Sequence, residues 1–162
     1  MTQDRYASER GSPEVPTCGV SPLTLHFDGK WLELRIGGYR AAYGAVSGKP
    51  LASGGFDYSV ERQKLKNVGP IPEGRYWIKP SDLWTNAWYR RGRYSAWGNY
   101  RVTLRVFPGT ETHGRGGFFI HGGTVRGSAG CIDLTSAMDS FVENMNKHKG
   151  RGDCYISVTV DY

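Results

Sequence analysis

The chain of 162 residues has few cysteines and no long apolar segment. Its apolar runs all fall well short of the roughly twenty residues that a membrane-spanning helix needs, so we expect no transmembrane segment. Residues 1–20 carry charges and lack the apolar stretch of a secretory signal peptide. We therefore expect a protein made in the cytoplasm and exported, if at all, by another route.

The three cysteines are Cys18, Cys131 and Cys154, and none of their spacings is that of a CxxC zinc or redox motif. We predict no metal and no other cofactor. Two arrangements stay open: a disulfide between Cys18 and Cys154 in an oxidising compartment, or free thiols throughout. The carboxylates are scattered, without the pairing that would suggest glycosidase chemistry.

The composition favours strands and turns over a helical bundle, with 23 Gly, 8 Pro and 13% aromatic residues. We predict one domain with a mainly β, β-rich α+β fold and a flexible arm at residues 1–20. The net charge of +6 favours an anionic partner without identifying it. Residues 84–97 mix arginine with aromatic residues, as in surfaces that stack bases or sugars, but also as in a solvated rim around a small aromatic core.

Period-two alternation and turn residues predict most of the strands. We expect a hairpin of 23–27 and 31–36 around Asp28-Gly29, and further strands at 39–46, 74–78, 101–107, 118–120 and 155–160. Residues 53–68 show no clear element. Apolar residues at helical spacing predict one amphipathic helix from about 134, with Thr135 as N-cap and Gly150 as its end.

Residues 117–134 read GFFIHGGTVRGSAGCIDL and contain the residues that carry chemistry. We expect His121 at a strand end and Cys131 in a glycine-rich turn ahead of the helix. A cysteine attacks an amide well only as thiolate, so His121 is the expected base. N–H groups around Gly130 and Cys131 are candidate oxyanion donors, and a carbonyl of residues 122–124 is expected to orient the imidazole.

The pattern His-Gly, spacer, Ser-x-Gly-Cys-Ile resembles the signature of YkuD-type L,D-transpeptidases. Residues 68–76 resemble that family's entry to a central strand, and residues 23–49 its opening strands. The resemblance implies a YkuD-like β-sandwich over residues 21–162, with an acyl-enzyme formed on Cys131 by a peptidoglycan stem peptide. The expected catalytic residues are therefore Cys131, His121 and, from the chemistry of its hydroxyl, Ser128, with backbone roles for Gly130 and Gly122.

Two positions depart from this pattern. Ala129 stands where the motif has a second histidine, so His121 is expected to be the sole base, and Asp133 replaces the usual Arg or Asn of a substrate-handling position. Both departures resemble the type VI secretion effectors with L,D-transpeptidase-like domains.

That likeness implies an antibacterial toxin that acts in the periplasm of a target cell. It would trim stem tetrapeptides as an L,D-carboxypeptidase, exchange the terminal D-alanine for other D-amino acids, or both. Its partners would be stem peptides, D-amino acids, the type VI secretion machinery and a cognate immunity protein. Residues 80–100 are a candidate capping insertion, whose aromatic residues Trp84, Trp88, Tyr94 and Trp97 would cover the substrate. Asp133 is a further candidate for substrate binding.

A competing interpretation needs no catalysis. The basic-aromatic residues would bind glycan or nucleic acid, and Cys131 would be structural. A Cys131→Ala protein would then keep its activity, whereas the enzyme interpretation, under which no nucleic acid is expected as partner, requires its loss. Papain-like peptidases are disfavoured because their cysteine precedes their histidine in the chain, the reverse of the order here.

Overall fold

The computed structural model describes residues 21–85, 99–150 and 152–162. Two β-sheets and the helices of this part of the chain confirm the predicted β-rich α+β fold. The strands are β1 (Thr24–Phe27), β2 (Trp31–Ile36), β3 (Tyr39–Gly44), β4 (Val46–Gly48), β5 (Gly74–Ile78), β6 (Trp84–Thr85), β7 (Tyr100–Thr103), β8 (Arg105–Val106), β9 (Phe119–His121), β10 (Ser128–Asp133) and β11 (Ile156–Val160). The α-helices are α2 (Val60–Gln63) and α3 (Met138–His148).

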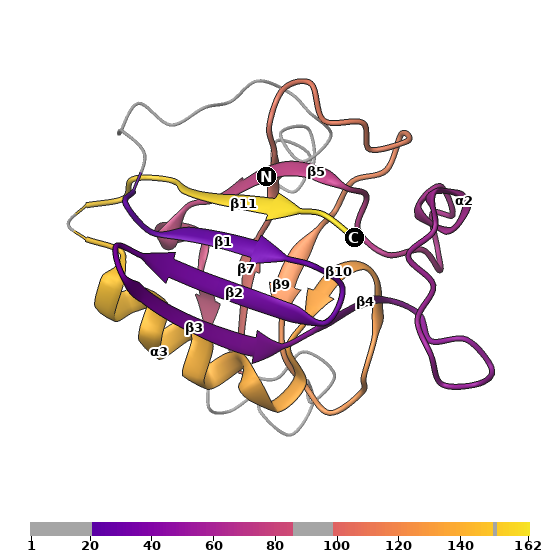
Figure 1. Ribbon diagram of the computed structural model, residues 1–162, viewed down its shortest axis with the longest axis horizontal. Coiled ribbons are helices and arrows are strands. Elements are labelled where there is room, and N and C mark those ends of the chain that lie inside the picture. Colours follow the sequence, from indigo (N-terminus) through magenta and orange to yellow (C-terminus); the bar gives the residue numbers. More distant parts are fainter. Residues whose placement is uncertain (1–20, 86–98, 151) are drawn as a thin grey trace.

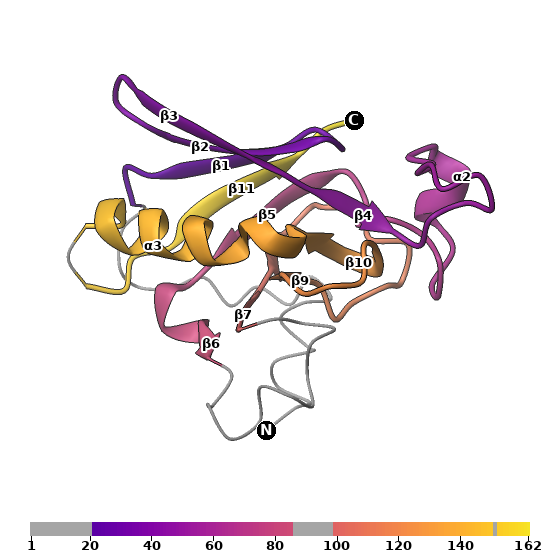
Figure 2. The ribbon, with the colours of Figure 1, turned by 90° about the horizontal axis from the view of Figure 1, so that it is seen from below.

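One sheet has the strand order β3-β2-β1-β11-β5-β8 and the other β4-β10-β9-β7-β6. The first sheet faces the viewer in Figure 1. Seen edge-on in Figure 2, it lies on one side of the molecule, with α3, β9 and β10 on the other. Apolar side chains from both sheets and from α3 form one buried cluster between them.

The predicted hairpin at the start of this region is confirmed by the antiparallel pairing of β1 with β2. Asp28 closes the turn, since its Oδ1 accepts the N–H of Lys30 at 2.9 Å and that of Trp31 at 2.8 Å. Gly29 takes a positive φ of 93° there, which costs glycine little. The inward residues Leu25, Phe27, Leu32 and Leu34 are all buried.

Two predicted strands are each divided between the sheets. Residues 39–46 form β3 and then β4, because the chain crosses to the second sheet at Ala45, whose N–H bonds the Lys30 carbonyl at 2.9 Å. Residues 101–107 likewise form β7 in the second sheet and β8 in the first. Alternation predicts an extended chain but does not indicate which sheet it joins.

The last strand, β11, is an interior strand of the six-stranded sheet. It pairs in parallel with β1 and antiparallel with β5, so chain segments from both ends of the described fold lie side by side. Ile156, Val158 and Val160 point into the core, as the predicted alternation requires.

The helix α3 packs its apolar residues Met138, Phe141, Val142 and Met145 into the core. The prediction of Thr135 as its N-cap is wrong. Thr135–Ala137 forms a 3-10 turn with no side-chain cap, and Thr135 has a positive φ of 47°. The predicted end is confirmed, since Gly150 adopts a φ of 82° just beyond the helix.

Residues 53–68, for which no element was predicted, contain α2. Ser59 caps this short helix, and Gln63 is buried with its amide bonded to the Tyr58 carbonyl and the Glu73 carboxylate. None of the helices in the described ranges is long and apolar enough to cross a membrane.

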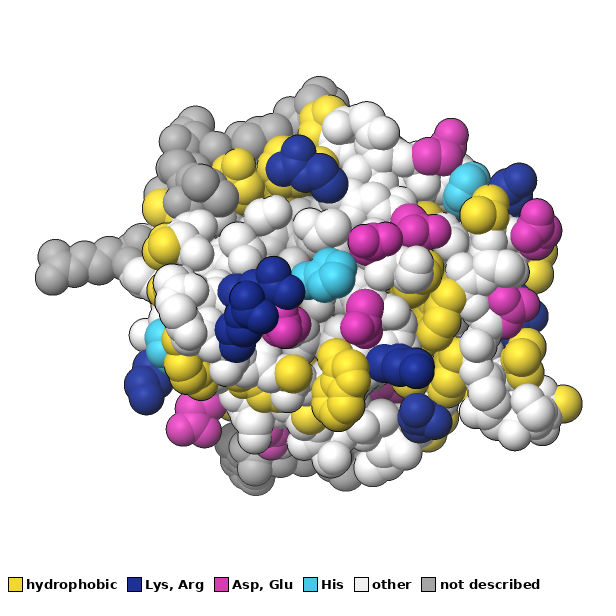
Figure 3. Space-filling view, in the orientation of Figure 1, with side chains coloured by type: hydrophobic (Ala, Val, Ile, Leu, Met, Phe, Trp, Pro, Cys, Tyr) yellow, Lys and Arg dark blue, Asp and Glu magenta, His cyan; other side chains and the backbone are white. Residues whose placement is uncertain are grey.

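The outer face of the six-stranded sheet mixes basic, acidic and histidine side chains (Figure 3). A groove of about 350 Å³ on this face is lined by His26, Asp28, Trp31, Glu33, Arg35 and Ala42. A nucleic-acid-binding surface is typically basic throughout, so this face does not support the nucleic-acid alternative.

Candidate active site

His121 and Cys131 lie on adjacent parallel strands of the second sheet. The register pairs Ile120 with Ile132 and His121 with Asp133. Because side chains alternate along a strand, His121, Cys131 and Asp133 share one face and the two isoleucines the other. Ile120 and Ile132 belong to the core cluster, so the three polar side chains face away from it.

Cys131 was predicted in a turn, and the structure corrects this to a strand. The pairing of β10 with β4 shifts register between Ser128 and Ile132, and this irregularity contains Cys131. Gly130 has a φ of 72° at that point, and a Cβ there would lie 3.1 Å from the Phe118 ring. Such bulges are common beside active sites because they re-aim a side chain. Cys131 itself is a buried free thiol.

The imidazole of His121 is buried and oriented by its own neighbour. Its Nδ1 lies 2.8 Å from the carbonyl oxygen of Gly122, which can only accept, so Nδ1 carries the proton. This is the contact expected from a carbonyl of residues 122–124. Within the described part of the chain, Nε2 is buried without a hydrogen-bond partner. The nitrogen that a catalytic base needs is therefore the one left available.

Gly122 has no room for a side chain. A Cβ would lie 2.5 Å from the Cβ of Met138 and 2.7 Å from the Thr135 carbonyl oxygen. Close packing of the residue 122 backbone against the start of α3 thus sets the position of the carbonyl that orients His121.

The pKa of His121 is raised above its usual value of 6.5. Burial is the largest influence and lowers the pKa, but the interactions of the ring with the Cys131 side chain, the Gly122 carbonyl and the charge of Asp133 together outweigh burial. The Cys131 side chain is thus close enough to act on the imidazole. These surroundings favour the protonated ring that results when His121 takes the proton of a thiol.

Asp133 is buried, and both of its oxygens accept backbone N–H groups. Gly127 donates to Oδ2 at 2.7 Å and Thr135 to Oδ1 at 2.9 Å. Burial raises the pKa of Asp133, although Thr135, His121, Gly127 and Arg126 all act to lower it. The carboxylate thus ties the loop before β10 to the turn before α3.

Arg115 was missed by the sequence analysis and lies beside β10, where its Nη2 is 3.2 Å from the position of a Cβ at Gly130. Its guanidinium is buried and donates to three backbone carbonyls, those of Gln63 at 2.5 Å, Pro70 at 2.6 Å and Gly69 at 3.0 Å. Burial lowers its pKa. Gly69 O also accepts the N–H of Gly130 at 2.9 Å, so Arg115 fixes the segment on which β10 rests.

The bond from Gly130 to Gly69 corrects part of the predicted oxyanion site, because that N–H is already used. Ser128, the third predicted catalytic residue, is half-buried at the start of β10 opposite Gly48. Trp84 lies in β6 with the Arg101 guanidinium 5.1 Å from its ring centroid. Trp88, Tyr94 and Trp97, and most of the predicted cap, lie outside the described residues.

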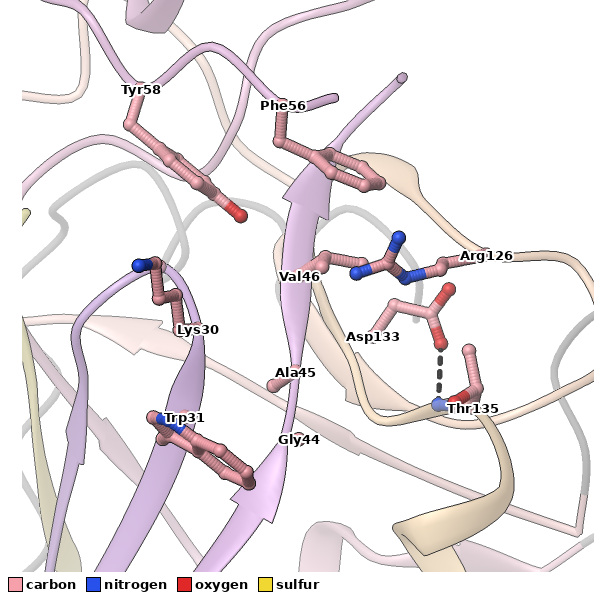
Figure 4. Close-up of a pocket in the computed structure, with 11 residues that line it drawn as sticks. Lys30, Trp31, Gly44, Ala45, Val46, Phe56, Tyr58, Arg126, Asp133 and Thr135 are labelled. Atoms are coloured by element: carbon pink, nitrogen blue, oxygen red, sulfur yellow. Dashed lines mark hydrogen bonds between the residues drawn. The ribbon is translucent and has the colours of Figure 1, made fainter. Parts of the chain in front are cut away.

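A cavity of about 460 Å³ adjoins the site. Asp133 and Thr135 line it (Figure 4). Cys131 and His121 do not line it, so the cavity lies beside these two residues, next to Asp133. Its other lining residues are Gly29, Lys30, Trp31, Gly44, Ala45, Val46, Phe56, Tyr58 and Arg126.

Cys154 is disulfide-bonded, which rules out free thiols throughout. Cys18, the partner considered for it, lies outside the described residues. No group of three or more His, Cys, Asp or Glu side chains among the residues that the structure describes is placed to hold a metal ion.

Comparison with known proteins bears on both the fold and the family. A solved structure, that of Bdellovibrio bacteriovorus Bd1075, matches with a TM-score of 0.51 at 18% sequence identity. The match covers 96% of this chain and 53% of the other, so this chain spans about half the length of that protein, and the likeness shows a shared fold. Curated protein sequences gave no significant match.

The Tlde1 domain model matches residues 52–152, which include α2, the strands β9 and β10 with His121 and Cys131, and α3. The match covers more than half of the 162 residues. The chain therefore belongs to the Tlde1 domain family, a family of type VI secretion effectors associated with L,D-transpeptidase-like domains.

Proposed function

We propose that this chain is a cysteine enzyme of peptidoglycan, acting on stem tetrapeptides as L,D-carboxypeptidase, as L,D-transpeptidase exchanging D-amino acids, or as both. The observation that carries the proposal is the orientation of His121. Its Nδ1 is engaged by Gly122 O, its Nε2 has no hydrogen-bond partner among the described residues, and Cys131 interacts with the ring. Family membership supports the same chemistry.

The reaction follows from this arrangement. His121 Nε2 takes the thiol proton, and the Cys131 sulfur attacks the carbonyl carbon of the bond between the diaminopimelate and D-alanine residues. The C–N bond breaks, and the leaving amine receives the proton from His121. Water or the amine of another D-amino acid then attacks the thioester, which releases Cys131. Asp133 stabilises the positive charge that His121 carries between these steps.

The proposal extends to biological role. As a Tlde1 effector, the protein would pass through the type VI secretion machinery and act in the periplasm of a target bacterium, where a cognate immunity protein would protect kin. Ser128 is proposed to assist the nucleophile with its hydroxyl, and residues 80–100 to cap the bound peptide.

Mass spectrometry of muropeptides tests this function. Wild-type protein incubated with peptidoglycan should convert tetrapeptides to tripeptides, and should incorporate an added D-amino acid if it also exchanges. Cys131→Ala and His121→Ala should lose conversion while their circular dichroism stays that of the wild type. His26→Ala, on β1, is the matched histidine control and should keep activity. Activity retained by Cys131→Ala would favour the binding-module alternative.

A further inference from the structure

The cavity beside Cys131 and His121 has the lining expected of a small-molecule binding site. Its walls include the aromatic rings of Trp31, Phe56 and Tyr58, and its cations are Lys30 and Arg126. A volume of about 460 Å³ lies in the range of sites for small molecules, which combine apolar walls with a few placed polar groups.

Arg126 is held over this cavity by its neighbours. Its guanidinium lies 5.0 Å from the Phe56 ring centroid and, in Figure 4, extends between Phe56 and Asp133. The next residue, Gly127, has a φ of 99°, and a Cβ there would lie 2.8 Å from the Gly48 carbonyl oxygen. Only glycine fits this position, so the backbone that carries Arg126 is fixed.

The guanidinium is also available to a ligand. Among the described residues, no carboxylate lies within the 4.0 Å ion-pair distance of Arg126. An arginine that lines a cavity and has no carboxylate at ion-pair distance in the described ranges suits a carboxylate ligand, which its planar fork binds through two parallel hydrogen bonds.

Asp133 determines where in the cavity that carboxylate lies. Both Asp133 oxygens already accept backbone N–H groups, and its negative charge disfavours a second anion nearby. The ligand carboxylate therefore belongs against Arg126, away from Asp133, with any side chain against the aromatic walls.

The distance from the nucleophile fits one amino-acid residue. Cys131 and Asp133 lie two residues apart in β10; in a regular strand this spacing corresponds to about 6.6 Å. One extended residue spans about 3.6 Å and a hydrogen bond adds about 2.9 Å. When a scissile carbonyl lies at Cys131, the carboxylate of the residue that follows it therefore reaches the groups beside Asp133.

We propose that Arg126 binds the free α-carboxylate of the terminal residue of the stem peptide and thereby makes the enzyme an exopeptidase. This inference rests on the proposed function. As the Cys131 S–C bond forms and the peptide C–N bond breaks, the terminal amino acid leaves from this cavity. In exchange, an incoming amino acid occupies the same position: its amine forms the new C–N bond, the C–S bond breaks, and the amine proton passes through His121 to the thiolate.

The test compares two substrates, a disaccharide tetrapeptide ending in D-alanine and its C-terminal amide. Wild type should prefer the free acid in kcat/KM by about tenfold or more, because hydrogen bonds to a charged group are strong. In Arg126→Met the two substrates should differ by less than about twofold. Arg126→Lys should keep part of the preference, and Arg40→Met, on exposed β3, should match the wild type. The ratio is internal to each preparation, so partial unfolding does not change it.

Equal rates on acid and amide in the wild type would overturn the carboxylate site while leaving the proposed function intact. Full preference retained by Arg126→Met would do the same. A wild-type protein that releases an amino acid from neither substrate would overturn both proposals.

Discussion

His121 and Asp133 are direct partners in the parallel pairing of β9 with β10, and His121 Nδ1 lies 3.8 Å from Asp133 Oδ1. The 3.8 Å separation exceeds hydrogen-bond distance. The Nδ1–H group instead donates its hydrogen bond to the Gly122 carbonyl. Asp133 therefore acts on the imidazole through its charge, and on the surrounding backbone through the N–H groups of Gly127 and Thr135.

Replacing Asp133 by Asn should lower the pKa of His121, because the carboxylate is one of the groups that raise it. The amide keeps one acceptor oxygen for the backbone. NMR titration of the His121 ring in wild type and Asp133→Asn measures the shift. An unchanged or higher His121 pKa in the variant would show that Asp133 has only a structural role.

Cys131 should have a larger effect on the same titration. Its interactions with the imidazole are the strongest influences that raise the pKa of His121. In Cys131→Ala, burial and the weaker contributions remain, so the titration midpoint should fall further than in Asp133→Asn. A fall smaller than that of Asp133→Asn would contradict the close pairing of thiol and imidazole.

The raised pKa of His121 predicts how stability changes with pH. The folded state binds this proton more tightly than the unfolded chain, whose value is near 6.5. The contribution is therefore fully present below that value and is lost as pH rises through the higher folded-state pKa. Relative to His121→Gln, wild type should lose free energy of unfolding as the pH is raised from about 5.5 past that range. Urea unfolding without reductant, which keeps the Cys154 disulfide, measures the free energy of unfolding of both proteins. A difference between wild type and His121→Gln that does not change with pH would contradict the raised pKa of His121.

Removing Arg115 should damage both stability and activity. Arg115→Met leaves the carbonyls of Gln63, Gly69 and Pro70 without their buried donor, at a cost of about 3 kcal/mol or more. Arg115→Lys should recover little, because an ammonium lacks the planar fork. Urea unfolding gives the free energies, and near-wild-type stability of Arg115→Met would contradict the anchoring role.

Gly122→Ala should impair catalysis by crowding, since its Cβ would collide with Met138 and with the Thr135 carbonyl. Overpacking of this kind costs about 1–3 kcal/mol and here would also move the carbonyl that orients His121. Gly38→Ala is the matched control, because nothing lies within 4 Å of a Cβ at that position. Equal activity of the two variants would remove the role assigned to Gly122.

The sequence predicted best where the pattern and the local chemistry agree. The β1–β2 hairpin follows from alternation and from an Asp28-Gly29 turn whose side-chain bonds are local. His121 at the end of a strand follows from the apolar run before it. The division of residues 101–107 between β7 and β8 was not predictable, because it depends on which sheet each half meets.

Two of the remaining errors in the sequence analysis occur where glycines flank the residue concerned. The Gly-rich sequence around Cys131 predicted a turn, but Gly130 permits a bulge within a strand. Arg115 sits between Gly114 and Gly116, a context that suggests an exposed loop, and only the folded chain brings the three carbonyls to it. A buried arginine leaves no local signal in the sequence when its partners are backbone oxygens far along the chain.

The intact mass of the protein during turnover tests the central claim most directly. Wild-type protein quenched after rapid mixing with stem tetrapeptide should gain the mass of the substrate minus its terminal amino acid, and peptide mapping should place that mass on Cys131. Cys131→Ala should gain nothing and convert no tetrapeptide. An adduct on another residue, or full conversion by Cys131→Ala, would contradict an acyl-enzyme on this cysteine.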